Sequence, residues 1–239
     1  LHVRSRRQRQ MCIRDSYVTL PCRAAKQKQP LKKKNQPMQN MDLAEQVRHI
    51  KRSLRGVMNG PVSASMREKG LTYKVNFGVE LPRLQQMSQE MPHTYELAAR
   101  LWKEDIRECR LLAGMLMPAA DFQADMAEVW VEQMRFAEEA ECSVMHLFCH
   151  TDWASQKAFE WIAAEEPMKQ LCGYLMLARL FMKGAVPNER DAQEYLDQTR
   201  VALVEGNTQV RLAASKALYK FMDLGTEQEK AGDELLNSL

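Results

Sequence analysis

The sequence lacks the short motifs that mark the common nucleotide-binding and hydrolase sites. It contains no glycine-rich phosphate loop, no dinucleotide-binding fingerprint and no serine nucleophile elbow. It also contains no CxxC knuckle of the kind that binds zinc. No apolar segment follows the early arginines, which argues against a signal peptide and a membrane anchor. We therefore expect no cofactor, no metal and no membrane partner.

Cysteine is scarce, with six residues in 239. Two fall within the first forty residues, and the other four lie on apolar faces of expected helices: Cys109, Cys142, Cys149 and Cys172. Unpaired thiols at core-facing positions predict a reducing compartment without disulfides, so we expect a cytoplasmic protein. Cys142, His146 and Cys149 share one helix face, which leaves a metal site as the alternative to buried thiols. Ligands from a single helix favour the buried thiols.

Acidic residues are almost absent from residues 1–40, where eleven Lys or Arg side chains accompany Asp15 alone. Almost nothing there can enter a core, so we expect a disordered leader. The run from Met11 to Ser16, MCIRDS, resembles the translation of a sequencing adapter. This resemblance predicts that the leader is not native and that the chain starts at Met38 or Met41. A basic arm that binds nucleic-acid phosphates is the alternative.

The rest of the chain is acidic, with 23 basic and 30 acidic residues in positions 41–239. Positions 41–110 hold twelve basic and nine acidic residues, whereas positions 111–210 hold seven basic and sixteen acidic ones. If the chain binds a nucleic acid, the binding surface would therefore have to lie mainly on the first part. Its candidates are four cations at helical spacing: Arg48, Lys51, Arg52 and Arg55. A solvated helix face is the alternative to phosphate contacts by these residues.

Apolar residues recur at helical spacing along the remaining chain, and no segment alternates convincingly as a strand does. The expected helices span residues 42–58, 62–69, 80–91, 94–103, 105–117, 121–135, 137–149, 152–165, 167–183, 188–204 and 208–224. Gly184, Gly206 and Gly225 are expected to cap helices in the left-handed conformation. Connections of two to six residues predict antiparallel neighbours. We expect one helical-repeat domain over residues 41–225 and a charged tail over residues 226–239.

A weak internal repeat indicates that the helix pairs are stacked. Residues 104–113 and 208–217 share the order polar or acidic, aliphatic, basic and then alanine, and residues 166–169 open a third such helix. One pair exposes its inner face, so several stacked pairs form a curved superhelix with a concave surface. The sequence thus predicts an all-α solenoid of HEAT-like repeats with a right-handed type of superhelix.

Two windows carry more detail than the rest. In residues 95–117, YELAARLWKEDIRECRLLAGMLM, a leucine–tryptophan pair ends one short helix, and Asp105 and Glu108 then stand at the N-cap and N3 positions of a capping box. In residues 73–84, YKVNFGVELPRL, a glycine–valine turn at Gly78 precedes a helix that opens with proline. Both windows resemble the DNA alkylation-repair glycosylases of the AlkD-like, HEAT-repeat family, and the helix spacing extends the resemblance from about residue 41 to residue 224.

The resemblance implies excision of N-alkylated purines, as in DNA glycosylases of the 3-methyladenine type. Family members hold the lesion against contacts with the DNA backbone and do not flip the base into a deep pocket. A carboxylate is needed beside the oxocarbenium-like sugar of the transition state. The residues that take the family's positions are Glu141 for the carboxylate, Lys169 for the cation, and Phe136, Lys216 and Tyr219 for the aromatic and flanking groups. For Glu141, an acidic helix N-terminus is the alternative interpretation.

Two functions are therefore considered for this chain. The first is a monomeric protein that binds duplex DNA on its concave surface, with base excision residual or altered because the family's catalytic residues are replaced. The alternative is a catalytically silent helical-repeat scaffold that binds a protein partner, which the net charge of −9 over residues 111–210 favours. Trp130, Trp153 and Trp161 are expected in the core rather than stacked on bases.

Overall fold

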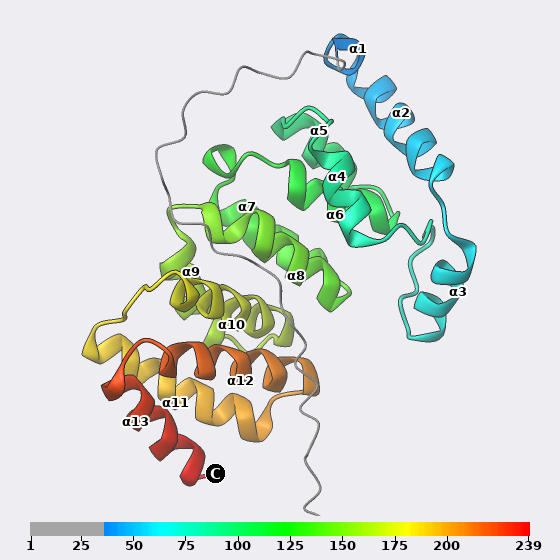
Figure 1. Cartoon of the computed structure of the whole chain (residues 1–239). Coiled ribbons are helices and arrows are strands. Elements are labelled where there is room, and N and C mark those ends of the chain that lie inside the picture. Colours follow the sequence, from blue (N-terminus) through cyan, green and yellow to red (C-terminus); the bar gives the residue numbers. More distant parts are fainter. Residues whose placement is uncertain (1–35) are drawn as a thin grey trace, which may run out of the picture. The chain divides into compact units, whose positions relative to one another are not determined.

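The computed structural model describes residues 36–239, which fold into α-helices (Figure 1). The first helices are α1 (Gln36–Gln39), α2 (Leu43–Gly56), α3 (Gly60–Glu68), α4 (Leu81–Ser88), α5 (Tyr95–Trp102), α6 (Arg107–Leu116) and α7 (Ala124–Gln133). They are followed by α8 (Ala137–His146), α9 (Ala154–Ile162), α10 (Pro167–Met182), α11 (Glu189–Glu205), α12 (Thr208–Met222) and α13 (Thr226–Asn237), with short 3-10 turns η1 (Ala119–Asp121) and η2 (Phe148–His150). The one β-type pairing among the described residues is an isolated bridge between Val75 and Ile106. The prediction of an all-α fold is confirmed.

The chain divides into two units, residues 1–34 and residues 35–239. Most of the expected leader, including the adapter-like run at residues 11–16, lies outside the described residues. Within residues 36–239, no helix has both the length and the apolar character needed to cross a membrane.

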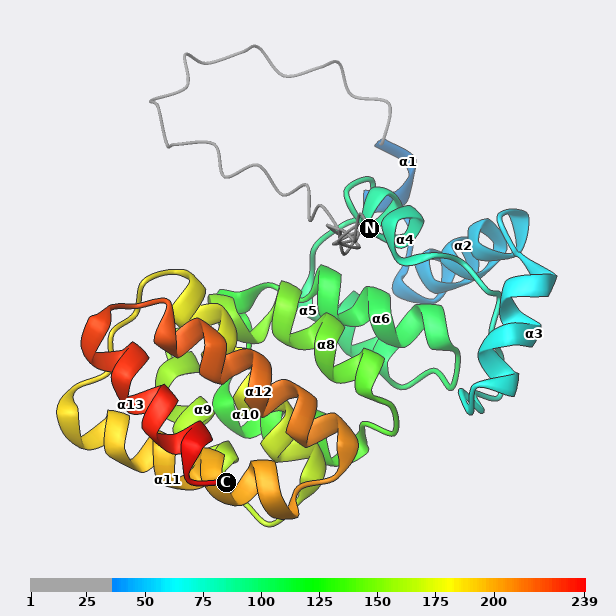
Figure 2. The ribbon, with the colours of Figure 1, turned by 60° about the horizontal axis from the view of Figure 1, so that its bottom comes forward.

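The helices stack in two rows. α4, α6, α8, α10 and α12 follow one another as direct neighbours, and α5, α9 and α11 pack against α6, α10 and α12 (Figure 2). We call α4, α6, α8, α10 and α12 the even-numbered row. The short connections within each pair make its two helices antiparallel. Stacked antiparallel pairs of this kind form the predicted HEAT-like solenoid.

Only one of the three predicted glycine caps adopts the left-handed conformation. Gly184 follows α10 with φ +83°, as predicted. Gly206 has φ −62° and Gly225 has φ 167°, so the prediction is wrong at both positions. At Gly206 the chain stays extended because Asn207 already caps the next helix. Glycine is needed there for close approach instead, since a Cβ would lie 2.3 Å from the carbonyl oxygen of Ala202.

The capping box predicted at Asp105 and Glu108 does not form. α6 begins at Arg107, one residue later than that box requires, and Asp105 makes an ion pair outside the helix. Glu108 is completely buried, and its carboxylate accepts hydrogen bonds from the backbone N–H groups of Phe77 at 3.1 Å and Val79 at 3.2 Å. The two windows that resemble one family in sequence are therefore in direct contact in the fold.

Arg107 completes this buried contact. Its Nη1 donates to the carbonyl oxygen of Val79 at 2.9 Å, and its Nε and Nη2 donate to Glu138 of α8 at 2.9 and 2.8 Å. Burial alone would lower the pKa of Arg107, but its bonds to Glu138 and the charge of Glu108 raise it. Gly78, at the centre of the turn, has φ +71°, which explains the glycine. α4, α6 and α8 are thus fixed to one another by a charged network.

Aromatic side chains form much of the core. The rings of Trp102 and Trp130 stack in parallel with centroids 4.0 Å apart. Trp161 is buried, and Trp153 packs against the core while its Nε1 donates to the carbonyl oxygen of Phe122 at 2.9 Å. The core positions predicted for Trp130, Trp153 and Trp161 are confirmed.

The residues expected as a charged tail form the helix α13. Leu235 of this helix is buried, and Gly232 lies so close to α12 that a Cβ there would meet Met222 Cγ at 2.4 Å. A short apolar stripe in an otherwise charged segment is therefore enough to attach α13 to the solenoid.

Candidate nucleic-acid interface

A pocket of about 490 Å³ opens between α8, α10 and α12 of the even-numbered row. Exposed charged and aromatic groups surround a more buried apolar floor. The lining residues are Glu141, Val144 and Met145 from α8, Leu175, Ala178, Arg179 and Met182 from α10, and Lys216, Tyr219 and Lys220 from α12. We call this the α8–α12 pocket.

Helical spacing explains why these side chains meet. Glu141 and Met145 are four residues apart on α8, and Leu175 and Arg179 are four apart on α10. Residues 216–220 of α12 span a little more than one turn. Each helix therefore presents one stripe of side chains, and the direct packing of α8, α10 and α12 brings the three stripes together.

The pocket contains charges that have no internal partner. Glu141, Arg179 and Lys216 form no ion pair or side-chain hydrogen bond with any other described residue. Lys220 differs, because its Nζ lies 2.8 Å from Asp223 Oδ2. A carboxylate, a guanidinium and an ammonium group are thus available to a ligand in this pocket.

Three of the residues selected from the sequence lie in this pocket: Glu141, Lys216 and Tyr219. Tyr219 is 58% exposed, which is unusual for an aromatic side chain within residues 38–239. The structure brings Glu141 of α8 together with Lys216 and Tyr219 of α12, although α8 and α12 are far apart in the sequence.

Lys169 lies in a different place. Its Nζ is 3.3 Å from Glu128 Oε2 and 3.3 Å from Glu166 Oε1. Glu128 also accepts hydrogen bonds from Lys157 Nζ at 2.9 Å and Trp161 Nε1 at 2.8 Å. Partial burial works to lower the pKa of Lys169, but the hydrogen bonds to the two glutamates raise it. Lys169 therefore belongs to a structural ion-pair network and does not line the pocket with Glu141.

Arg179 supplies a cation in the pocket that the sequence pattern did not predict. The family resemblance aligns its arginine with residues 171–172 of this helix, where neither side chain is cationic, so that Lys169 is the nearest substitute. Arg179 follows Cys172 by seven residues, which is two helical turns, so the two positions face nearly the same side. That spacing is the signal in the sequence that points to Arg179.

Phe136 also lies outside the pocket. Its ring packs on Tyr73 with centroids 4.4 Å apart, and the guanidinium of Arg135 lies 5.6 Å from the ring centroids of both. Phe136 precedes α8 as its N-cap residue. The structure thus gives Phe136 a packing partner within the protein.

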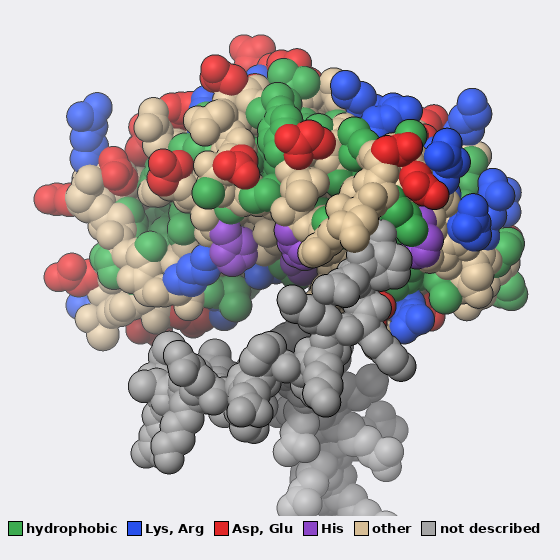
Figure 3. Space-filling model, turned by 90° about the horizontal axis from the view of Figure 1, so that it is seen from above, with side chains coloured by type: hydrophobic (Ala, Val, Ile, Leu, Met, Phe, Trp, Pro, Cys, Tyr) green, Lys and Arg blue, Asp and Glu red, His purple; other side chains and the backbone are tan. Residues whose placement is uncertain are grey.

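The basic side of α2 remains largely free. Arg48, Arg52 and Arg55 are exposed, whereas Lys51 Nζ forms an ion pair with Glu104 at 2.7 Å. Figure 3 shows Lys and Arg side chains gathered at the end of the molecule that carries α2 and α3, with acidic side chains spread along the rest of that face. We call Arg48, Arg52 and Arg55 the α2 basic surface.

His146 joins α8 to α4 beside the pocket. Its Nε2 lies 3.3 Å from Nε2 of Gln85 on α4. Burial lowers the pKa of His146 first, and the positive charges of Arg179 and His150 lower it further. Both effects favour the neutral form of the imidazole.

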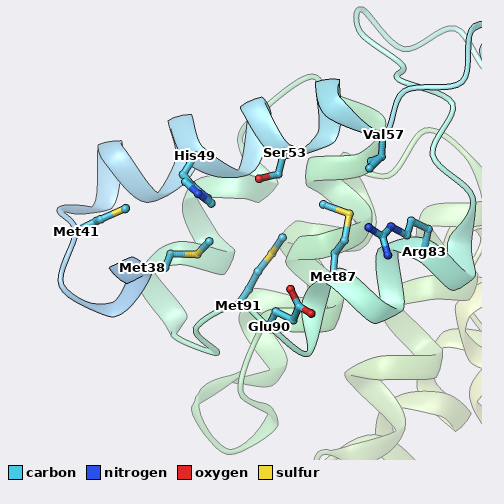
Figure 4. Close-up of a pocket in the computed structure, with 9 residues that line it drawn as sticks. All are labelled: Met38, Met41, His49, Ser53, Val57, Arg83, Met87, Glu90 and Met91. Carbon is cyan, nitrogen blue, oxygen red and sulfur yellow. The ribbon is translucent and has the colours of Figure 1, made fainter. Parts of the chain in front are cut away.

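A second pocket, of about 270 Å³, lies between α2 and α4. Figure 4 shows the side chains of Met38, Met87, Met91 and His49 around this space. Flexible methionines suit an adaptable apolar cavity more than a binding site for phosphate. Among residues 36–239 no group of three or more His, Cys, Asp or Glu side chains is arranged to hold a metal ion.

Comparisons with known proteins agree with the helical-repeat fold. Residues 50–221 match the protein family described as DNA alkylation repair enzyme. One solved structure is similar over 79% of this chain and 80% of its own, with a TM-score of 0.71 and 14% sequence identity. It is described as "a new family of proteins related to the HEAT-like repeat DNA glycosylases with affinity for branched DNA structures". No curated protein matches the sequence.

Proposed function

Because the chain belongs to the DNA alkylation repair enzyme family, we propose that it binds duplex DNA along the even-numbered row, with the α2 basic surface as a second contact. One observation carries the proposal: α8, α10 and α12 present the unpaired side chains of Glu141, Arg179 and Lys216 to one pocket. DNA phosphates would contact the two cations and release the counterions that accompany free DNA. Affinity should therefore fall steeply with salt.

The acidic charge of residues 111–210 does not oppose this proposal, because most of these acidic residues lie outside α8, α10 and α12. Five of the sixteen acidic residues are on α11: Glu189, Asp191, Glu194, Asp197 and Glu205. Others are neutralised inside the fold, as Glu128, Glu138 and Glu139 are by lysine or arginine. Glu141 is the one acidic residue in the lining of the α8–α12 pocket.

Base excision at this site would use Glu141. A cationic N-alkylated purine leaves the sugar as a neutral base, and positive charge develops on the deoxyribose. A carboxylate beside that sugar stabilises the charge or orients the attacking water. Arg179 would hold the neighbouring phosphate and take the place of the cation that the family resemblance had assigned to Lys169.

DNA binding without excision is also consistent with the description of the similar solved structure. The similar solved structure is described as having affinity for branched DNA, and its helical fold matches most of this chain. We therefore extend the proposal to branched DNA as well as to linear duplexes.

The scaffold function keeps one specific observation in its favour. Val201 and Val204 of α11 and Leu212 of α12 are 50%, 61% and 58% exposed. Exposed aliphatic side chains beside an acidic helix suit a protein partner with apolar and basic groups. Because Leu212 lies on α12, such a partner would cover part of the even-numbered row and compete with DNA there.

We also infer a cytoplasmic location. Cys109, Cys142, Cys149 and Cys172 are buried with free thiols. Burial raises the pKa of Cys109 and of Cys142 to about 12, so these groups stay protonated and unreactive. Four unpaired buried thiols suit a reducing compartment.

The proposed function is tested with duplex DNA that carries N-methylated purines. Release of free base by the full chain, with loss of release in Glu141→Gln, would establish a glycosylase that uses Glu141. DNA binding that weakens with salt, without base release, would establish the binding function alone. Absence of DNA binding at low salt would leave the protein-scaffold function.

A further inference from the structure

We propose that the α8–α12 pocket holds one unpaired nucleobase, so that the protein prefers DNA with an unpaired nucleotide to a fully paired duplex. This inference rests on the proposed DNA-binding function and adds a site for the base itself. The resemblance to the AlkD-like family does not predict such a site, since those enzymes do not flip a base into a deep pocket.

The size and the floor of the pocket suit a base. Its volume of about 490 Å³ is within the range of roughly 300–1,000 Å³ that small-molecule pockets occupy. Val144, Leu175 and Ala178 form an apolar floor that is buried or half-buried. A phosphate gains nothing from such a floor, whereas the flat face of a base does.

Tyr219 provides an aromatic face at this pocket. It is 58% exposed, and every other aromatic side chain in residues 38–239 is buried or half-buried. Bases stack on aromatic rings with little dependence on sequence. An exposed phenol beside an apolar floor is therefore placed to cover one face of an unpaired base.

The charged groups around the pocket match the rest of a nucleotide. Arg179 and Lys216 approach from α10 and α12, where they can bind the phosphates on either side of the base. Glu141 can accept hydrogen bonds from an exocyclic amino group, which adenine, guanine and cytosine carry and thymine lacks. Unpaired adenine or cytosine should thus bind more tightly than unpaired thymine.

The test compares three DNA duplexes that differ at one position, by fluorescence anisotropy with the full chain. The first is fully paired, the second has a single bulged adenine, and the third has a bulged abasic nucleotide. The abasic bulge has a similar capacity to bend and lacks the base. We expect the adenine bulge to bind about tenfold more tightly than either of the others, as one stacked base would provide.

Two variants of α12 connect that preference to the pocket. Tyr219→Ala should reduce the ratio of adenine-bulge to abasic-bulge affinity to about one, and Tyr219→Phe should retain it. Val204→Ala is the matched control, because Val204 is 61% exposed and lies on α11, outside the even-numbered row. The control should keep the wild-type ratio.

The outcomes separate this inference from the proposed function. Equal affinity for the adenine and abasic bulges would overturn the base pocket, because the protein would then recognise only DNA shape. A preference for adenine that persists in Tyr219→Ala would also overturn it. If none of the three duplexes binds at low salt, the DNA-binding function itself fails.

Discussion

The carboxylate of Glu108 accepts a hydrogen bond at 3.1 Å from the backbone N–H of Phe77, a residue 31 positions earlier in the chain. The other oxygen of the same carboxylate accepts from the N–H of Val79 at 3.2 Å. One buried side chain therefore satisfies two backbone donors of a turn and fixes that turn against α6. Because Arg107 continues the network to Glu138 on α8, the start of the even-numbered row depends on it.

Replacement of Glu108 with glutamine should strongly destabilise the fold. The amide lacks the charge that compensates Arg107, and its NH₂ group replaces one of the two oxygens that accept from the backbone N–H groups of Phe77 and Val79. We expect a loss of about 3–5 kcal/mol in the free energy of unfolding, as for other buried charge pairs that lose one partner. Urea unfolding of the wild type and the variant measures this loss in the free energy of unfolding. Asp223→Asn, which alters an exposed ion pair, should have little effect, and an equal loss in both variants would contradict this role for Glu108.

Gly78→Ala should also destabilise the turn. Gly78 has φ +71°, and an added Cβ would lie 2.2 Å from the carbonyl oxygen of Asn59. Strain and steric overlap together should lower the free energy of unfolding by roughly 2–4 kcal/mol. Gly70 has φ +93°, but a Cβ added there would meet no atom within 4 Å, so Gly70→Ala should cost only about 1–2 kcal/mol. Thermal unfolding of both variants provides the comparison, and a smaller effect at Gly78 than at Gly70 would refute the steric argument.

Local sequence predicted the helices but not the long-range pairs of the site. Apolar periodicity and proline or glycine breaks identify where helices lie, because both act within a few residues. The partner of Glu108 is 31 residues away, and the partner of Lys169, Glu128, is 41 residues away. Propensity carries no information at that distance, so the local pattern indicated a capping residue at Glu108, and the family resemblance indicated a site residue at Lys169. Arg179 escaped prediction because its seven-residue spacing from Cys172 gains a meaning only once α10 is packed against α8 and α12.

Glu128→Gln should weaken the network around Lys169 in a pH-dependent way. Burial would raise the pKa of Glu128, but hydrogen bonds from Trp161 and Lys157 lower it below the ordinary 4.5. A carboxylate with a lowered folded-state pKa contributes stability above its unfolded-state pKa, and that contribution is lost as the pH falls through the folded-state pKa. The variant should lose about 1–2 kcal/mol at pH 7 and match the wild type in strong acid. A difference that does not change between these conditions would exclude ionisation of Glu128 as its source.

Arg179→Ala should weaken DNA binding without unfolding the protein. Arg179 is half-buried in the α8–α12 pocket and has no ion-pair partner among the described residues. Loss of one phosphate contact should lower the slope of log Kd against log salt concentration by about one. Arg190→Ala provides the control, since Arg190 is an exposed arginine on α11. The same slope in wild type and Arg179→Ala would remove Arg179 from the interface.

Charge reversal of the α2 basic surface tests whether DNA extends to that end of the protein. Arg48, Arg52 and Arg55 are exposed, so their joint replacement by glutamate should leave the fold intact. Lys51 is left unchanged because its ion pair with Glu104 contributes to packing. Three reversed charges should lower duplex affinity by at least about a hundredfold near physiological salt, since each phosphate contact and its counterion release are replaced by repulsion. Reversal of Arg190, Arg200 and Lys230 on α11 and α13 gives the same change in net charge away from the even-numbered row. If that control weakens binding as much as the α2 variant does, net charge alone governs affinity and α2 makes no specific contact.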